Sequence, residues 1–134
     1  MRRTAAVLSV LLALAGAAAC TAPVRQYACR VDPSVAAPDV DAVWSCNRDV
    51  LRRAAAGGKF SIREFEAAAA FFRNVTGIDF DLIESALGPL PGEGLRGDLE
   101  ALDAWYARHH DRLSWDPDLR RVVLEGVAPV PGAV

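Results

Sequence analysis

Apolar residues recur at steps of three and four from Val40 onward, the spacing that gathers side chains on one face of an α-helix. The first segment of this kind covers residues 40–56 and stops at Gly57-Gly58. The pattern predicts an amphipathic first helix. Its apolar positions are Val40, Val43, Trp44, Val50, Leu51 and Ala54.

The second periodic segment, residues 62–76, carries a signal at each end. Ser61 followed by Glu64 is a capping box, in which each side chain can bond a free backbone amide of the first turn. Gly77 supplies the left-handed residue that commonly ends a helix. A second helix is therefore predicted, with an apolar face of Ile62, Phe65, Ala68, Ala69, Phe72 and Val75.

Two more helices are predicted further along the chain. Asp79 or Asp81 can begin a short third helix that ends at Leu87, because carboxylates favour the positive end of a helix dipole. Residues 88–94 are rich in Gly and Pro and are predicted to be a loop. Apolar residues with alternating steps of four and three then predict a fourth helix over residues 96–113.

The C-terminal part changes character. Asp116-Pro117-Asp118 is typical of a turn. Residues 121–125 have the composition of a strand, but a lone strand needs a partner, so an extended segment lying across the helices is the alternative. Residues 128–134 are predicted to be a flexible tail.

The predicted fold class is mainly α: a small bundle of three to four helices over residues 40–127, with a short extended C-terminal segment. Residues 20–39 contain three prolines and no clear apolar period, so they are expected to form an extended tether before the bundle. The whole chain has 134 residues, the length of one domain.

The N-terminus has the three parts of a secretory signal. Met1-Arg2-Arg3 is positive, residues 4–16 are apolar, and residues 17–19 are small. A membrane-spanning helix needs about 20 apolar residues, and this run is shorter. Residues 1–19 are therefore predicted to be a signal peptide, with a buried N-terminal helix as the alternative.

The junction Ala17-Ala18-Ala19-Cys20 resembles the lipobox of bacterial lipoproteins. The resemblance covers the first 20 residues and implies that Cys20 carries a lipid such as palmitate and becomes the first mature residue. Lipoboxes usually have Leu where this chain has Ala17, so ordinary cleavage after an A-x-A signal, giving a secreted soluble protein, is the alternative. Thr21 in place of Asp resembles lipoproteins sorted to the outer membrane, which leaves the inner or outer membrane open.

The chain has three cysteines, and an odd number in an exported protein calls for an explanation. If Cys20 is lipidated, Cys29 and Cys46 remain as an even pair in a compartment where disulfides persist. A bridge between them would stabilise the chain by about 3 kcal/mol. Two free thiols are the alternative.

The charge excludes one class of partner. Loss of the signal would leave 13 basic residues against 17 acidic ones, a formal charge of −4. A mildly acidic chain without a basic stripe is a poor nucleic-acid binder, and it adheres poorly to anionic lipid. The membrane is therefore expected as a partner only through Cys20.

Sequence motifs point to no catalytic residue, metal or cofactor. Phosphate loops, nucleophile elbows and zinc-binding histidine pairs do not occur. Trp105, His109 and Trp115 are possible partner or ligand contacts, since aromatic residues are enriched in binding hot spots. The segment from Asp103 to Asp116 resembles tail segments of uncharacterised exported bacterial proteins, which names no activity.

Two functions follow as hypotheses. The first is a membrane-tethered, non-enzymatic interaction or structural module that contacts another protein of the bacterial cell envelope. It predicts an exposed apolar patch that involves Trp115 or the Phe71/Phe72 edge. The alternative is a small envelope enzyme or ligand binder that uses a cleft around His109, with Asp103 and Asp111 beside Trp105.

Overall fold

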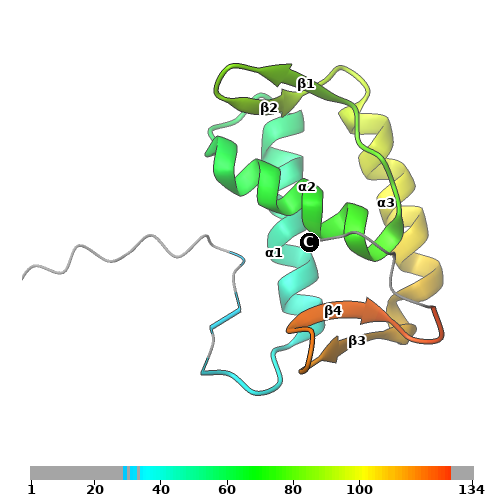
Figure 1. The fold of residues 1–134 in the computed structure, drawn as a ribbon. Coiled ribbons are helices and arrows are strands. Elements are labelled where there is room, and N and C mark those ends of the chain that lie inside the picture. Colours follow the sequence, from blue (N-terminus) through cyan, green and yellow to red (C-terminus); the bar gives the residue numbers. More distant parts are fainter. Residues whose placement is uncertain (1–28, 30, 33, 128–134) are drawn as a thin grey trace, which may run out of the picture.

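The computed structural model describes residue 29, residues 31–32 and residues 34–127. It contains three α-helices, two β-hairpins and one 3-10 turn. Figure 1 shows the hairpins at opposite ends of the helical layer. In chain order the elements are α1 (Val40–Ala55), α2 (Ile62–Thr76), β1 (Leu82–Ser85), β2 (Gly88–Pro91), α3 (Leu95–His109), the 3-10 turn His110–Arg112, β3 (Leu113–Asp116) and β4 (Arg121–Leu124).

The predicted bundle of three to four helices is wrong. The described residues form three helices together with two antiparallel two-stranded sheets, β1–β2 and β3–β4. The segment predicted as a third helix forms β1, and the segment predicted as a loop forms β2. The predicted signal peptide, Cys20 and the predicted tail lie outside the described residues.

Asp81 explains why the chain turns into a hairpin instead of a third helix. Its backbone N–H donates to the Asp98 carboxylate at 2.7 Å, and its own carboxylate accepts the Gly94 N–H at 2.7 Å. The Gly92 N–H donates to the Asp81 carbonyl at 2.8 Å. A helix that began at Asp79 or Asp81 would use the Asp81 carbonyl for a bond to the N–H four residues on, and here that carbonyl is taken by Gly92.

The prolines of β2 fit the sheet because of their register. The Gly92 N–H donates to the Asp81 carbonyl, so these two residues form a hydrogen-bonded pair. Because hydrogen-bonded and non-hydrogen-bonded pairs alternate along the hairpin, Leu82 with Pro91 and Glu84 with Pro89 are non-hydrogen-bonded pairs. The backbone nitrogens of Pro91 and Pro89 therefore face away from β1, where no N–H is needed for the ladder. A proline-rich segment can therefore form a strand without losing a ladder bond.

The second hairpin begins where the last predicted helix was expected to continue. Helix α3 ends at His109, and Leu113 begins β3, where it pairs with Leu124. The predicted turn is confirmed: Asp116 Oδ1 accepts the N–H groups of Asp118 and Leu119, both at 2.9 Å. The strand-like character of residues 121–125 is also confirmed, with β3 as the partner.

The first two helices have the predicted bounds to within one residue, but their caps differ from expectation. Asp39 caps α1, accepting the N–H groups of Asp41 and Ala42 at 3.0 and 3.2 Å. Ser61 lies at the N-cap of α2 without a side-chain cap bond, so the predicted capping box is wrong. Gly77 ends α2 in the left-handed conformation, with φ 73°, as predicted.

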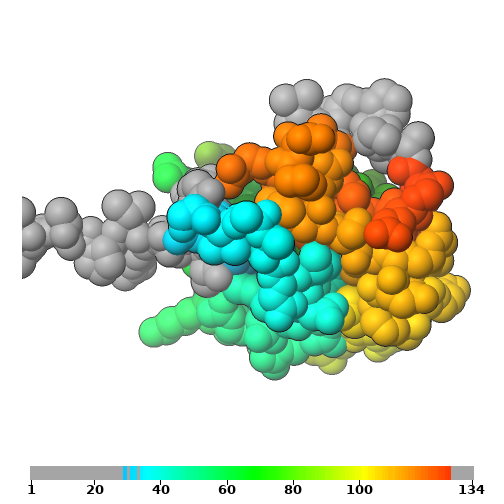
Figure 2. Space-filling model, turned by 90° about the horizontal axis from the view of Figure 1, so that it is seen from below, coloured from blue at the N-terminus to red at the C-terminus, as the bar shows by residue number. Residues whose placement is uncertain are grey.

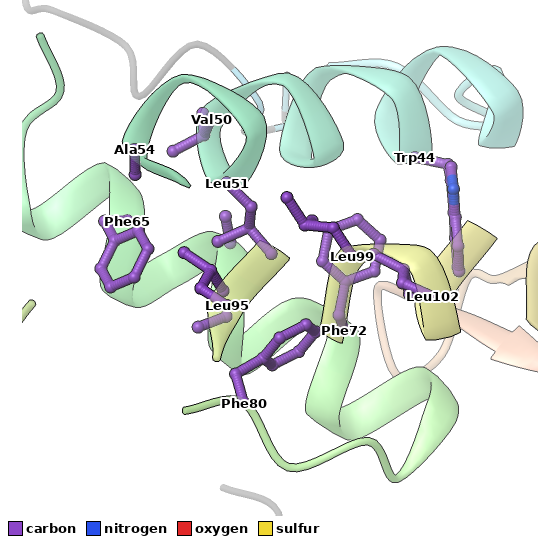
Figure 3. Close-up of a cluster of buried hydrophobic side chains, with 12 residues drawn as sticks. Trp44, Val50, Leu51, Ala54, Phe65, Phe72, Phe80, Leu95, Leu99 and Leu102 are labelled. Atoms are coloured by element: carbon purple, nitrogen blue, oxygen red, sulfur yellow. The ribbon is translucent and has the colours of Figure 1, made fainter. Parts of the chain in front are cut away.

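The core lies between the three helices, where apolar side chains from each form one cluster (Figure 3). Full burial of a Leu or Phe side chain contributes roughly 1.5–3 kcal/mol. The residues with no more than 1% exposure include Val50, Leu51, Phe65, Phe72, Leu95 and Leu102.

Cys29 and Cys46 lie at disulfide distance, as predicted, with their Cα atoms 5.4 Å apart. The bridge joins the chain ahead of α1 to the second turn of that helix. Figure 2 shows the N-terminal part of α1 in cyan beside the β3–β4 hairpin in orange. The bridge is therefore at the β3–β4 end of the molecule.

Candidate functional site

Trp105, one of the predicted contact residues, belongs to a stack of rings that joins α1 to α3. The buried Trp44 ring lies 5.6 Å from the Trp105 ring at an interplanar angle of 9°, and 4.7 Å from the Tyr106 ring at 28°. Such pairs stabilise by about 0.5–1.5 kcal/mol beyond their buried area. Part of the role of Trp105 is therefore packing.

His109 continues this stack, with its ring 4.7 Å from that of Trp105. Its Nδ1 atom is buried and has no hydrogen-bond partner among the described residues. The ring is partly covered. His110 lies on the exposed side, where its Nδ1 is 3.2 Å from the Tyr106 carbonyl oxygen.

The acidic residues expected near His109 lie elsewhere. Asp103 accepts two hydrogen bonds from the Arg48 guanidinium of α1, both at 2.5 Å. These bonds hold the pKa of Asp103 below its usual value. Asp111 is exposed on the 3-10 turn. The structure therefore does not bring His109, Asp103 and Asp111 around one cavity.

Tyr106 makes a second polar link between α1 and α3. Its hydroxyl donates to Asp41 Oδ1 at 2.7 Å. Burial, together with this bond to a carboxylate, raises the pKa of Tyr106 to about 12. Both the Arg48–Asp103 pair and this bond connect the same two helices, so they hold the scaffold under the ring stack.

A groove of about 380 Å³ has Trp105 among its lining residues. It runs between the last turn of α2, Trp105 and the β3–β4 hairpin. This groove, called the β4 groove below, lies next to Trp105, a predicted contact residue. The residues that line it are Asn74, Val75, Thr76, Gly77, Trp105, Asp116, Leu119 and residues 121–127.

Trp115 lines a second, smaller hollow of about 260 Å³, which we call the Cys29 hollow. Its side chain is half-buried on β3, where Trp115 pairs with Val122. Trp105 and Trp115 therefore lie in different hollows. The lining of the Cys29 hollow is Cys29, Val31, Val43, Phe71, Trp115, Arg120, Arg121 and Val122.

The apolar side chains exposed to solvent are not those expected. Phe72 is fully buried, and Phe71 is half-buried against the core. The first hairpin carries two exposed ones, Leu87 at 82% and Ile83 at 54%, and Leu119 and Val127 are exposed at the β3–β4 end. The predicted Phe71/Phe72 edge is therefore part of the core instead of the surface.

Within the described ranges, no group of three or more His, Cys, Asp or Glu residues is placed to hold a metal ion. Among the same residues, every helix is too short or too polar to cross a bilayer. Comparison of the chain with protein-family models, curated proteins and solved structures gives no match.

Sequence reasoning missed the β4 groove because its walls come from three separate elements. The sequence pattern places Val75 on the face and Gly77 at the end of a helix, and it identifies no partner strand for residues 121–125. The combination of a left-handed Gly77 with a strand-like segment further along the chain was the available signal. It could not show that the two lie side by side.

Proposed function

We propose that this protein is a lipid-anchored, non-enzymatic interaction module of the bacterial cell envelope, attached through Cys20. The observation that carries the proposal is the cysteine pairing. With Cys29 and Cys46 joined to each other, Cys20 is the remaining cysteine of three, and it stands at the end of a signal-like segment. An acylated cysteine at this position accounts for the odd number.

The bridge also sets how far the domain extends from the anchor. Cys29 follows Cys20 by nine positions, and nine extended residues span at most about 30 Å. The β3–β4 end, which carries the bridge, would therefore lie near the bilayer. The β1–β2 hairpin would point away from it, since the two hairpins occupy opposite ends of the helical layer (Figure 1).

The first hairpin supplies the surface we assign to contact with an envelope protein. Leu87 lies between β1 and β2, and both it and Ile83 on β1 are exposed large apolar residues. Exposed apolar groups that the core does not use are a common mark of protein contact when they occur together. A module anchored near its β3–β4 end would present the β1–β2 hairpin to a partner protein.

The anchor is tested by the intact mass of the protein isolated from its native host, before and after reduction. A chain that begins at Cys20 with a diacylglyceryl or triacyl mass, and that gains two hydrogens on reduction, supports the proposal. The Cys20→Ser variant serves as the control and should lack the lipid. An unmodified wild-type chain would contradict the anchor.

The contact surface is tested separately by photo-crosslinking in intact cells. A photoreactive residue in place of Leu87 should give a discrete crosslinked species with an envelope protein. The matched control places the same group at Glu100, an exposed position on α3. Equal crosslinking at both positions, or none at Leu87, would remove the hairpin from the proposal and leave the anchor untouched.

A further inference from the structure

The outer edge of β4 carries backbone groups that β3 does not use. The Glu125 N–H donates to the Arg112 carbonyl at 2.9 Å, so this pair is a hydrogen-bonded one. Bonding alternates along an antiparallel pair, and the groups of Val123 therefore point to β3, whereas those of Val122 point away from it. In this way the N–H and C=O of Val122 face away from the hairpin, along the β4 groove.

The chain reverses immediately after β4. The Val127 N–H donates to the Leu124 carbonyl at 3.3 Å, which closes a turn around Glu125 and Gly126. Gly126 has φ 78°, a conformation that glycine adopts without strain. The turn brings Val127 back beside β4, where it lines the groove.

The rim of the groove is apolar and exposed among the described residues. Leu119 is 50% and Val127 56% exposed, and both line the groove together with Trp105 and Val75. A strand edge beside exposed apolar groups is a surface that proteins usually cover. The segment that begins one residue after Val127 is the nearest candidate to cover it.

We propose that residues 128–134 of this chain dock in the β4 groove, along the outer edge of β4. The segment reads Ala-Pro-Val-Pro-Gly-Ala-Val and has no charged or hydrogen-bonding side chain. Seven extended residues span about 23 Å, whereas the four residues of β4 span about 13 Å. The segment is therefore long enough to follow the groove from Val127.

The register limits how the segment is held. The turn pairs Val127 with Leu124, so an antiparallel continuation would place Pro129 opposite Val122. Proline has no N–H, but its carbonyl can accept the Val122 N–H. The docked segment would make this one bond at Val122, and apolar contacts with the groove walls would supply the rest. This inference does not depend on the lipid anchor.

The test is amide hydrogen exchange of the exported protein with and without residues 128–134. Removal of the segment should speed exchange of the Val122 amide by at least about tenfold, because its acceptor is lost. Val123 is the internal control, since its amide bonds to β3 and should keep its protection. A variant with residues 128–134 replaced by a Gly-Ser segment of equal length should behave like the truncation.

Three results would overturn the proposal. The first is equal exchange at Val122 with and without the segment. The second is a parallel rise at Val122 and Val123, which would report general loss of the hairpin. The third is protection of Val122 that survives truncation but disappears on dilution, which would assign the groove to a second copy of the chain.

Discussion

The two hairpins have strands of equal length but are supported differently by the rest of the molecule. Each consists of two antiparallel four-residue strands, but Ile83 and Leu87 of the first hairpin are exposed, whereas Val122 on β4 is only 4% exposed. Polar bonds at Asp81 hold the base of the first hairpin. Apolar packing holds the second, and the disulfide lies near it. The same local structure is thus stabilised in two ways.

Strand pairing alone does not stabilise either hairpin. An isolated two-stranded hairpin is at best marginally stable in water. Each hairpin therefore depends on what the helices offer at its end of the molecule. Substitutions that remove one kind of support should affect one end and spare the other.

The largest effect is expected from the Cys29→Ser/Cys46→Ser double variant. Loss of a bridge that closes a 17-residue separation should lower the free energy of unfolding by about 3 kcal/mol, and it should act at the β3–β4 end. Chemical denaturation measures it. A reductant should destabilise the wild type equally and leave the variant unchanged. Unequal stability losses would show that the serines act by some route other than the missing bridge.

The next largest effect on stability is expected from truncating a buried apolar residue on β4, compared with an exposed one on β1. Val122→Ala should cost about 2 kcal/mol, since it removes buried carbon atoms and leaves a cavity. Ile83→Ala should change stability by less than about 0.5 kcal/mol, because Ile83 is largely exposed. Thermal denaturation of both variants measures the contrast. Similar losses would show that the hairpins are supported alike.

The first hairpin should respond instead to its polar base. Asp81→Ala removes the carboxylate that accepts the Gly94 N–H and should cost about 1 kcal/mol. Amide exchange should rise along β1 and β2 and stay unchanged along β3 and β4. Glu84→Ala is the matched control, since Glu84 is exposed on the same hairpin. Equal exchange in the two variants would contradict this role of Asp81.

The smallest effect concerns the helices between the hairpins and appears only at alkaline pH. The pKa of Tyr106 is raised in the folded chain to about 12 from its ordinary value of 10.0. The folded state therefore favours the protonated phenol. The resulting stability is fully present below pH 10 and is lost as the pH rises toward 12.

Tyr106→Phe tests this linkage, because the variant lacks the ionisable hydroxyl. Its unfolding free energy should fall less steeply with pH than that of the wild type between pH 10 and 12. Both hairpins should respond equally, since Tyr106 joins α1 to α3 instead of supporting one hairpin. Parallel pH profiles of the unfolding free energy for the two proteins would show that ionisation of Tyr106 is not coupled to folding through the Asp41 bond.

The helices were predictable from the sequence, and the hairpins largely were not. Helices α1 and α2 follow from apolar spacing and from Gly77, which are local signals. The first hairpin depends on Asp81 meeting Gly94 and Asp98, which are distant in sequence. The prolines of β2 suggested a loop, because their register against β1 was not visible.

The candidate site was predictable only in part. The sequence identified Trp105, His109 and Trp115 as notable, and the structure places them in a ring stack and in two different hollows. The groove beside Trp105 depends on the edge of β4. That edge exists because Leu113 leaves the helix to begin β3, whereas its apolar spacing predicted that the helix would continue.

The bridge between Cys29 and Cys46 also determines how the domain bears a mechanical load. A pull on the chain ahead of Cys29 passes through the sulfur atoms and enters α1 at Cys46, in the second turn of the helix. The described residues between the two cysteines, including the first six residues of α1, lie outside that covalent path and bear no tension. The Asp39 cap and the first turn of α1 are therefore shielded from tension, and the force reaches the helix one residue before Asn47, which is buried.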